Sequence, residues 1–269
     1  MSKETEPMYR LDAYAKEFDA VVTALDTDRG GVYLDRTAFY PGGGGQPCDH
    51  GVLRVQSAGH GAGEGAERGA QAPSAAASAP GAVRGGAPVE LPVTAVEKGH
   101  LHIVEGELPE VGTPVRGQID WDHRFALMRT HTAFHILCGV VWRDYGAQVT
   151  GGNMAPLSGR MDFEFERLDR ELITKIEASV NAEVDAAREV RARILPREEA
   201  EQIPDLIRTK VNLLPQGITE IRTIEIEGLD LQADGGTHVA NTGEVGAIRL
   251  PKFKNKGGIN KRIYLELPE

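Results

Sequence analysis

Two short stretches of this chain, about a hundred residues apart, carry side chains typical of a metal site. His131 and His135 are four residues apart, which places both imidazoles on one face of a helix, about 6 Å from each other. Residues 234–238 (DGGTH) offer Asp234 and His238 across a tight glycine turn. Imidazole and carboxylate groups suit zinc, and a shared ion would require this helix to pack against this turn. A lone histidine pair at this spacing is equally compatible with ordinary core or surface residues.

The first 120 residues have the pattern of strands. Short β-rich runs separated by turn residues fill 17–55, and strand patterning resumes in 89–96, 100–104 and 115–120. This pattern is consistent with a small barrel. Helical spacing begins at Asp122, the predicted N-cap, and continues through Trp142.

The second half combines helices with strands. An amphipathic helix is predicted over 169–190, and residues 149–154 are predicted to form a turn. Further strands are expected at 160–165, 220–226, 246–253 and 260–267. The predicted fold class is therefore α+β, with a small N-terminal β-barrel domain (1–118) followed by a metal-binding α/β-sandwich domain (119–269).

Two glycine-rich stretches interrupt the barrel pattern. The four glycines at 42–45 fit neither strand nor helix, and they permit positive φ angles and close approach of a ligand or another segment. In residues 57–88, 19 of 32 residues are Ala or Gly, and Val83 is the only large aliphatic residue. Such a segment buries too little apolar surface to offset its ordering entropy, so we predict a disordered insertion.

Composition restricts the class of protein and its location. With 41% hydrophobic and 26% charged residues, the chain reads as a soluble globular protein. The sequence contains no run of 18 apolar residues, so we expect no membrane span. The N-terminus is charged and lacks an apolar core, so we do not expect it to be a signal peptide. Two cysteines in unrelated contexts, Cys48 and Cys138, favour a reducing cytoplasm.

Charge is unevenly distributed along the chain. The net charge of −10 argues against a protein that coats nucleic acid non-specifically. Residues 249–262 nevertheless contain six Lys and Arg residues and no acidic residue. This segment is either a solvated face or a phosphate-binding strip, in which Lys254 and Lys256 are candidates.

His100 and His102 form a weaker metal candidate. They alternate along a predicted strand, which would place both imidazoles on its polar face. A pair of histidines without further ligands carries little weight.

Several separated motifs, taken together and in their order along the chain, resemble those of a known family. Residues 131–135 (HTAFH) and 235–239 (GGTHV) resemble the metal-binding core of the editing domain of alanyl-tRNA synthetase and of its free-standing AlaX-type relatives. Residues 39–51 match the glycine-rich signature of the preceding barrel, and Arg124 and Arg129 fit the pattern before the histidines, as do 160–163 and 241–246 after them. A chain of this length lacks room for an adenylation domain, so the resemblance is to a stand-alone editing protein.

The resemblance implies hydrolysis of the ester between a wrong amino acid, mainly serine but also glycine, and the 3′-terminal adenosine of tRNA(Ala). It implies one Zn²⁺ per chain, bound by His131, His135, Asp234 and His238. The implied catalytic residues are Thr37, which would contact the serine hydroxyl, and Gln46, which would contact the ester or the ribose. The implied substrate-binding residues are Gly43, Gly44, Gly45, Arg129, Lys254 and Lys256.

Asp234 departs from the family pattern, which usually has cysteine at this position. Asp234 has three alternative roles: a direct ligand, a group that orients water at the metal, or a hydrogen-bond partner of a ligating histidine. Cys138, seven residues after His131 on the same helical face, is either a substitute thiolate or a buried structural cysteine.

Two other functions remain compatible with these residues. The chain could be a tRNA- or metal-binding module without catalysis, which would agree with the loss of the cysteine. It could also be a metal-dependent hydrolase of a small ester or amide. The oligomeric state does not follow from the sequence.

Overall fold

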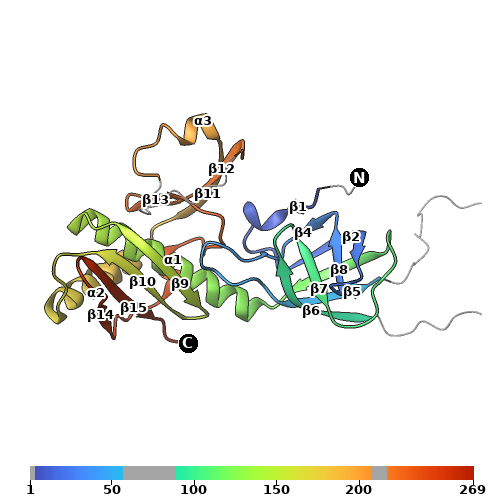
Figure 1. Cartoon of the computed structure of the whole chain (residues 1–269), viewed down its shortest axis with the longest axis horizontal. Coiled ribbons are helices and arrows are strands. Elements are labelled where there is room, and N and C mark those ends of the chain that lie inside the picture. Colours follow the sequence, from blue (N-terminus) through green and yellow to red (C-terminus); the bar gives the residue numbers. More distant parts are fainter. Residues whose placement is uncertain (1–3, 57–88, 207–216) are drawn as a thin grey trace, which may run out of the picture.

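The computed structural model describes residues 4–56, 89–206 and 217–269, and the insertion predicted at 57–88 lies outside the described residues. A closed barrel lies at one end and a group of helices and sheets at the other, with helix α1 (Trp121–Tyr145) extending between them (Figure 1). Within the described residues, no helix is long and apolar enough to cross a membrane.

The barrel expected from the strand patterns is present. Its strands close in the order β2-β3-β7-β6-β5-β8, and all neighbours are antiparallel. Apolar side chains that alternate along these strands, among them Val32, Leu34 and Leu53, are fully buried inside it. The strands are β2 (Glu17–Asp26), β3 (Gly31–Leu34), β5 (Gly51–Val55), β6 (Glu90–Glu97), β7 (Leu101–Val104) and β8 (Pro114–Ile119). Outside the barrel, the short β1 (Glu6–Pro7) pairs in parallel with β4 (Arg36–Thr37).

The prediction that His102 lies on a polar strand face is wrong. His102 is fully buried in the barrel, where its Nε2 lies 2.8 Å from Thr37 Oγ1 and its Nδ1 lies 3.3 Å from the carbonyl oxygen of Val32. His100 lies in the turn before β7, and its Nε2 contacts the Tyr9 hydroxyl at 3.0 Å. Because both ring nitrogens of His102 have hydrogen-bond partners, this pair does not form a metal site.

Helix α1 is buried on almost every side. It begins one residue before the predicted N-cap, since Asp120 and not Asp122 caps it by accepting a hydrogen bond from the backbone N–H of His123. It ends at Gly146, which adopts the left-handed conformation. Fifteen of its residues are buried, because the helix contacts two sheets and a second helix. These contacts are with β9 (Val149–Ala155) and β10 (Ser158–Glu164) of one sheet, with β13 (Asp230–Ala233) of another, and with helix α2 (Arg170–Asp185).

Two antiparallel sheets complete the fold. One has the order β14-β15-β10-β9 and the other β11-β12-β13. The first contains β9 (Val149–Ala155), β10 (Ser158–Glu164), β14 (Phe253–Asn255) and β15 (Asn260–Glu266). The second contains β11 (Val190–Pro196), β12 (Glu220–Ile226) and β13 (Asp230–Ala233). Short helical turns lie at η1 (Met8–Arg10), α3 (Arg197–Ala200) and η2 (Thr242–Val245). The α+β class agrees with the prediction.

Several boundaries differ from the prediction. Residues 149–154 form a strand and not a turn, because their backbone pairs with β10. Most of 246–253 is not a strand, and an isolated bridge joins Arg249 to Glu266 there. Helix α2 ends at Asp185, five residues before its predicted end, since Ala187 adopts a φ of 48° that no helix continues through.

A buried ion pair joins α1 to the barrel. The Arg124 guanidinium donates to both carboxylate oxygens of Asp49, and neither side chain is exposed. Arg124 also donates to the carbonyl oxygens of Ala13 and Ala38, while Asp49 accepts from the backbone N–H of Tyr40. The contacts fix both ends of the glycine-rich loop between Tyr40 and Asp49 relative to α1.

Candidate metal centre

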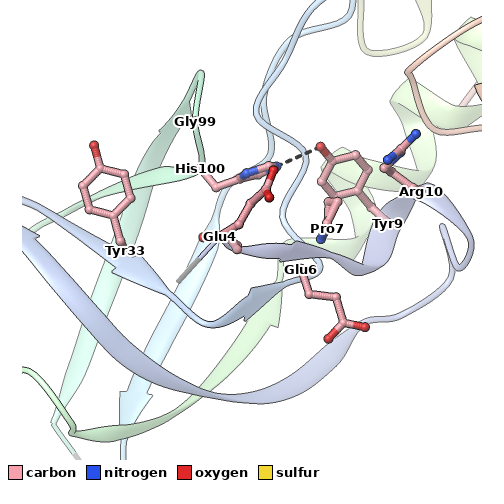
Figure 2. A pocket seen from close by; sticks show the side chains of 9 residues that line it. Glu4, Glu6, Pro7, Tyr9, Arg10, Tyr33, Gly99 and His100 are labelled. Atoms are coloured by element: carbon pink, nitrogen blue, oxygen red, sulfur yellow. Dashed lines mark hydrogen bonds between the residues drawn. The ribbon is translucent and has the colours of Figure 1, made fainter. Parts of the chain in front are cut away.

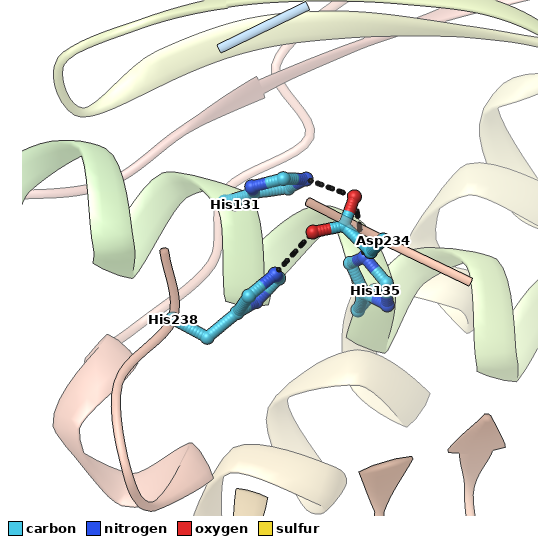
Figure 3. A group of neighbouring side chains, drawn as sticks. All are labelled: His131, His135, Asp234 and His238. Carbon is cyan, nitrogen blue, oxygen red and sulfur yellow. Dashed lines mark hydrogen bonds and ion pairs between the residues drawn. The ribbon is translucent and has the colours of Figure 1, made fainter. Parts of the chain in front are cut away.

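The four predicted ligands lie together in the structure. His131 and His135 project from α1, while Asp234 and His238 come from the turn after β13 (Figure 3). One candidate ligand atom from each residue lies within 4.8 Å of the other three. A single ion bonded at about 2 Å to each ligand therefore requires only small side-chain shifts.

The histidines direct their Nε2 atoms at the Asp234 carboxylate. His238 Nε2 lies 3.0 Å from Oδ1, while His131 Nε2 and His135 Nε2 lie 3.4 and 4.0 Å from Oδ2. Oδ1 also accepts a hydrogen bond of 2.7 Å from the backbone N–H of Gly236. Both carboxylate oxygens thus lie among the imidazoles, which is the placement expected of a fourth ligand.

Each Nδ1 atom is held by a separate partner. His131 Nδ1 lies 2.9 Å from Gln46 Oε1, His135 Nδ1 lies 2.8 Å from Asp230 Oδ2, and His238 Nδ1 lies 3.3 Å from Thr132 Oγ1. The backbone N–H of Thr237 also donates to Gln46 Oε1, so this oxygen is an acceptor and His131 Nδ1 must carry the proton. The Asp230 carboxylate imposes the same tautomer on His135. Their Nε2 lone pairs are consequently directed toward the centre, as in metal sites.

Burial keeps the imidazoles of His131 and His238 neutral. It lowers the pKa of His131 to about 4 and the pKa of His238 well below its ordinary value, and the neighbouring histidines add to both effects. Burial alone would raise the pKa of Asp234, but His131 and the hydrogen bond from His238 hold it well below its usual range. Neutral imidazoles around an ionised carboxylate are the protonation states that metal binding requires, so the donor set fits zinc.

Two glycine segments allow the centre to form. A Cβ on Gly236 would lie 2.3 Å from Cε1 of His131 and 2.6 Å from Gln46 Oε1, so only glycine lets the turn pass beneath this imidazole. Residues 42–45 all have positive φ angles, which explains the run of four glycines. Reciprocal backbone hydrogen bonds between Gly43 and Gln46 close this loop and direct the Gln46 side chain at His131.

A cavity of about 780 Å³ opens beside the centre. His135 and Asp234 contribute to its wall from the metal side, and the glycine loop and strands β12 and β13 enclose it. This volume lies within the range of about 300–1,000 Å³ that small-molecule sites occupy. Other residues in its wall include Tyr40, Gly42, Gly43, Gly44, Glu220, Arg222 and Gln232.

Gln46 is placed differently from its implied role as a substrate contact. Its side chain is buried, its Oε1 accepts from His131 and Thr237, and its Nε2 donates to Thr237 Oγ1 at 2.8 Å. With both amide atoms engaged, Gln46 orients a histidine in this conformation.

Thr37 is also separated from the cavity wall. It is fully buried in the barrel, and its hydroxyl lies 2.8 Å from His102 Nε2 and accepts from the backbone N–H of Phe39. This conformation therefore does not form the serine contact implied for Thr37.

The predicted substrate-binding residues do not all lie together. Gly43 and Gly44 line the cavity, whereas Gly45 packs against β9 and accepts a hydrogen bond from the backbone N–H of Met154. Arg129 donates to the carbonyl oxygens of Val245 and Pro268, so its guanidinium binds the chain itself.

The basic strip and Cys138 lie outside the cluster. Lys254 Nζ lies 5.9 Å from the centre of the Tyr264 ring, and Lys256 Nζ lies 3.3 Å from Asp162 Oδ2. Cys138, a residue of α1, is buried in the hydrophobic core and does not belong to the four-residue group.

Three contributors to the site had no signal in the sequence. Asp230 and Thr132 hold the Nδ1 atoms of two histidines. Arg222 is buried in the cavity wall, where its Nη1 donates to the carbonyl oxygen of Asp234 and lies 3.9 Å from the carboxylate. Asp230 does lie four residues before Asp234 in the sequence, but two carboxylates at this spacing are too common to indicate a role.

Comparison with known proteins gives the class of this fold and site. Residues 221–264, which include Asp234 and His238, match the family described as "Threonyl and Alanyl tRNA synthetase second additional domain". The match gives the class: beside its barrel, the chain has a domain of the kind that threonyl- and alanyl-tRNA synthetases carry as an additional domain.

Individual relatives narrow the class. The chain is 37% identical to the alanyl-tRNA editing protein AlaX-M of Methanosarcina acetivorans over 98% of its own length and 99% of that protein. It is 38% identical to AlaX-M of Saccharolobus solfataricus, over 97% and 98% of the two chains. The chain is also 34% identical to the alanine–tRNA ligase of Pyrobaculum neutrophilum. That alignment covers 93% of this chain but only 25% of the ligase. The chain belongs to the alanyl-tRNA editing protein family, as the motifs predicted.

Proposed function

We propose that this protein hydrolyses the ester that joins serine, or glycine, to the 3′-terminal adenosine of mischarged tRNA(Ala), at a zinc centre formed by His131, His135, Asp234 and His238. Family membership makes it a hydrolase of aminoacyl-tRNA esters; the amino acids, the metal and the residue roles are our proposal. The supporting observation is that four side chains able to bind a metal meet beside a cavity lined by the glycine loop, with two of them, His135 and Asp234, forming part of its wall.

A second site of this kind has a clear physical purpose. A synthetase pocket shaped for alanine rejects serine and glycine poorly, since one hydroxyl or methyl group changes binding by only about 1–3 kcal/mol. Hydrolysis at a separate site removes the wrong esters after they form.

The roles of individual residues follow from their contacts. Zinc, when bound, supplies a Lewis acid for the ester carbonyl and for water. Gln46, Asp230 and Thr132 keep the imidazoles oriented toward that ion. Gly43 and Gly44 leave the cavity wall without side chains, so that the terminal ribose can approach the backbone.

The basic strip, Lys254 foremost, is proposed to contact tRNA phosphates, with the two domains at 1–118 and 119–269 acting as one binding unit. We also propose a cytoplasmic location. Cys48 packs against the barrel core, whereas Cys138 on α1 belongs to a different core cluster, and this separation suits a protein without disulfides.

Hydrolysis of Ser-, Gly- and Ala-tRNA(Ala), measured with and without a chelator, tests the function. We expect serine and glycine to be released and alanine to be spared, with activity lost on chelation and restored by zinc. His135→Ala should remove bound metal and activity together. The matched control is His50→Ala, because His50 is exposed and contacts His123 outside the cluster. Equal rates on all three esters, or full activity without metal, would contradict the proposal.

Asp234→Cys separates the roles of that residue. The thiolate is a softer ligand that restores the usual family set, so zinc content should stay at one per chain and affinity should rise. Unchanged affinity would place Asp234 outside the ligand set.

A further inference from the structure

A second cavity, of about 760 Å³, adjoins the metal-site cavity. Glu4, Tyr9 and Arg10 line both, so the two spaces share a wall. On its other side the second cavity is bounded by Tyr33 of β3 and by His100 in the turn before β7 (Figure 2). The barrel and the N-terminal segment therefore form a second space that continues from the cavity beside the candidate metal centre.

Tyr9 forms the partition between the two cavities. Its ring is buried and packs edge-to-face on Tyr40, a residue of the metal-side cavity, with ring centres 5.3 Å apart. Its hydroxyl contacts His100 Nε2 at 3.0 Å. His100 has a φ of 64°, which is uncommon for a residue with a Cβ. The contact with Tyr9 holds this imidazole at the cavity despite the unfavourable backbone conformation.

The remaining groups have the chemistry that suits a nucleotide. The Tyr33 side chain is half-buried, which leaves an aromatic surface for a base. Arg10 supplies a cation at the boundary with the metal-side cavity, where a phosphate between two nucleosides would lie. The carboxylate of Glu6 lies 3.6 Å from Arg36. The Glu4 carboxylate instead lies beside His100 (Figure 2), where it acts electrostatically on that imidazole.

We propose that this second cavity binds the cytidine that precedes the terminal adenosine of the tRNA 3′ end, with its base on Tyr33, its exocyclic amine donating to Glu4 and its 3′ phosphate near Arg10. The proposal rests on the proposed function, which places the aminoacylated adenosine in the metal-side cavity. A carboxylate accepts from the N4 amine of cytosine, whereas the O4 atom of uracil offers it no proton. Single-stranded 3′ ends suit a stacking platform of this kind, because their bases are free to leave the helix.

The test compares three seryl esters: seryl-adenosine, seryl-CpA and seryl-UpA. We expect kcat/KM to be highest for seryl-CpA, about tenfold above seryl-UpA, with seryl-adenosine lowest. In Glu4→Gln the side-chain amide can donate to O4 of uracil, so the ratio of CpA to UpA should fall to about one. Tyr33→Ala should lower kcat/KM for both dinucleotides by about tenfold while their ratio stays constant.

Glu6→Gln is the matched control, since this carboxylate belongs to the same segment but pairs with Arg36. It should leave the preference for CpA unchanged. Equal kcat/KM for seryl-CpA and seryl-UpA in the wild-type protein, or a preference that survives Glu4→Gln, would overturn the inference.

Calorimetric titration with uncharged CpA and UpA separates this inference from the proposed function. A tenfold preference for CpA that Glu4→Gln abolishes would support the cytidine site even if no ester were hydrolysed, in which case the proposed function alone would fail. Equal binding of the two dinucleotides would overturn the inference, whatever the esters show.

Discussion

Replacing Gln46 by leucine should weaken metal binding, although Gln46 is not itself a candidate ligand. The side chain is 3% exposed and makes three hydrogen bonds, to His131 Nδ1, Thr237 N and Thr237 Oγ1. Leucine has a similar size and no polar atom. The substitution therefore leaves the imidazole N–H and one backbone N–H buried without an acceptor, and it frees the His131 ring to rotate.

The magnitude follows from these contacts. Losing the partner that orients a ligating histidine typically reduces metal affinity by about 10–100-fold, which is about 1.4–2.8 kcal/mol. Each of the two unpaired buried donors also costs about 1–3 kcal/mol of folding stability. We expect a protein that still folds, with zinc affinity reduced by about 30-fold.

Competition with a chromophoric chelator measures this affinity, and hydrolysis of Ser-tRNA(Ala) at saturating zinc measures activity. Gln46→Glu is the matched variant, because its carboxylate can accept from both His131 and Thr237, and the Thr237 hydroxyl can rotate to donate. It should keep zinc affinity near the wild-type value. If Gln46→Leu binds zinc as tightly as the wild type and yet loses hydrolysis, then Gln46 acts on the substrate and our reasoning is refuted.

Three further substitutions test other parts of the structure. Gly236→Ala places a methyl group within 2.3–2.6 Å of His131 and Gln46, so zinc content per chain should fall in elemental analysis. Arg124→Met leaves the Asp49 carboxylate buried without its cation, and the free energy of unfolding in urea should drop by about 3–5 kcal/mol; a drop below 1 kcal/mol would contradict this. Burial lowers the pKa of His102 to about 4 from an ordinary value near 6.5, so the unfolded chain takes up a proton that the folded chain excludes. That contribution to stability is complete above pH 6.5 and decreases by about 3 kcal/mol as the pH falls to 4, and His102→Gln should remove this part of the pH dependence in urea titrations.

The sequence predicted that the four side chains of the candidate metal centre belong to one site, and they do lie together, because the signal in each stretch is local. The spacing of His131 and His135 needs only a helix, and 234–238 needs only a turn. The partners of these residues were not predictable, because they meet across long separations: Gln46 lies 85 residues from His131 and 191 from Thr237. A glutamine in a glycine-rich loop gives no indication of which imidazole it will contact.

The same distinction explains the errors in the fold. The barrel strands and α1 have clear periodicity, and they were found. The alternation of residues 100–104 predicts that His102 lies on a polar face, but in the closed barrel its ring centre lies 5.5 Å from that of Phe39 and its Nε2 contacts the Thr37 hydroxyl. Residues 149–154 contain two glycines and resemble a turn, and only the pairing with β10 makes them a strand.

The candidate metal centre depends on contacts between the barrel and the α+β part of the chain. The four candidate ligands all come from residues after 120, but the barrel loop supplies Gln46, which fixes the tautomer of His131. The buried ion pair between Arg124 of α1 and Asp49 holds that loop against the helix. Glu4, Tyr9 and Arg10 then complete the cavity from the N-terminal segment. The barrel is therefore part of the site and not an appended module, because without it His131 would lose its orienting partner and the cavity would lose one wall.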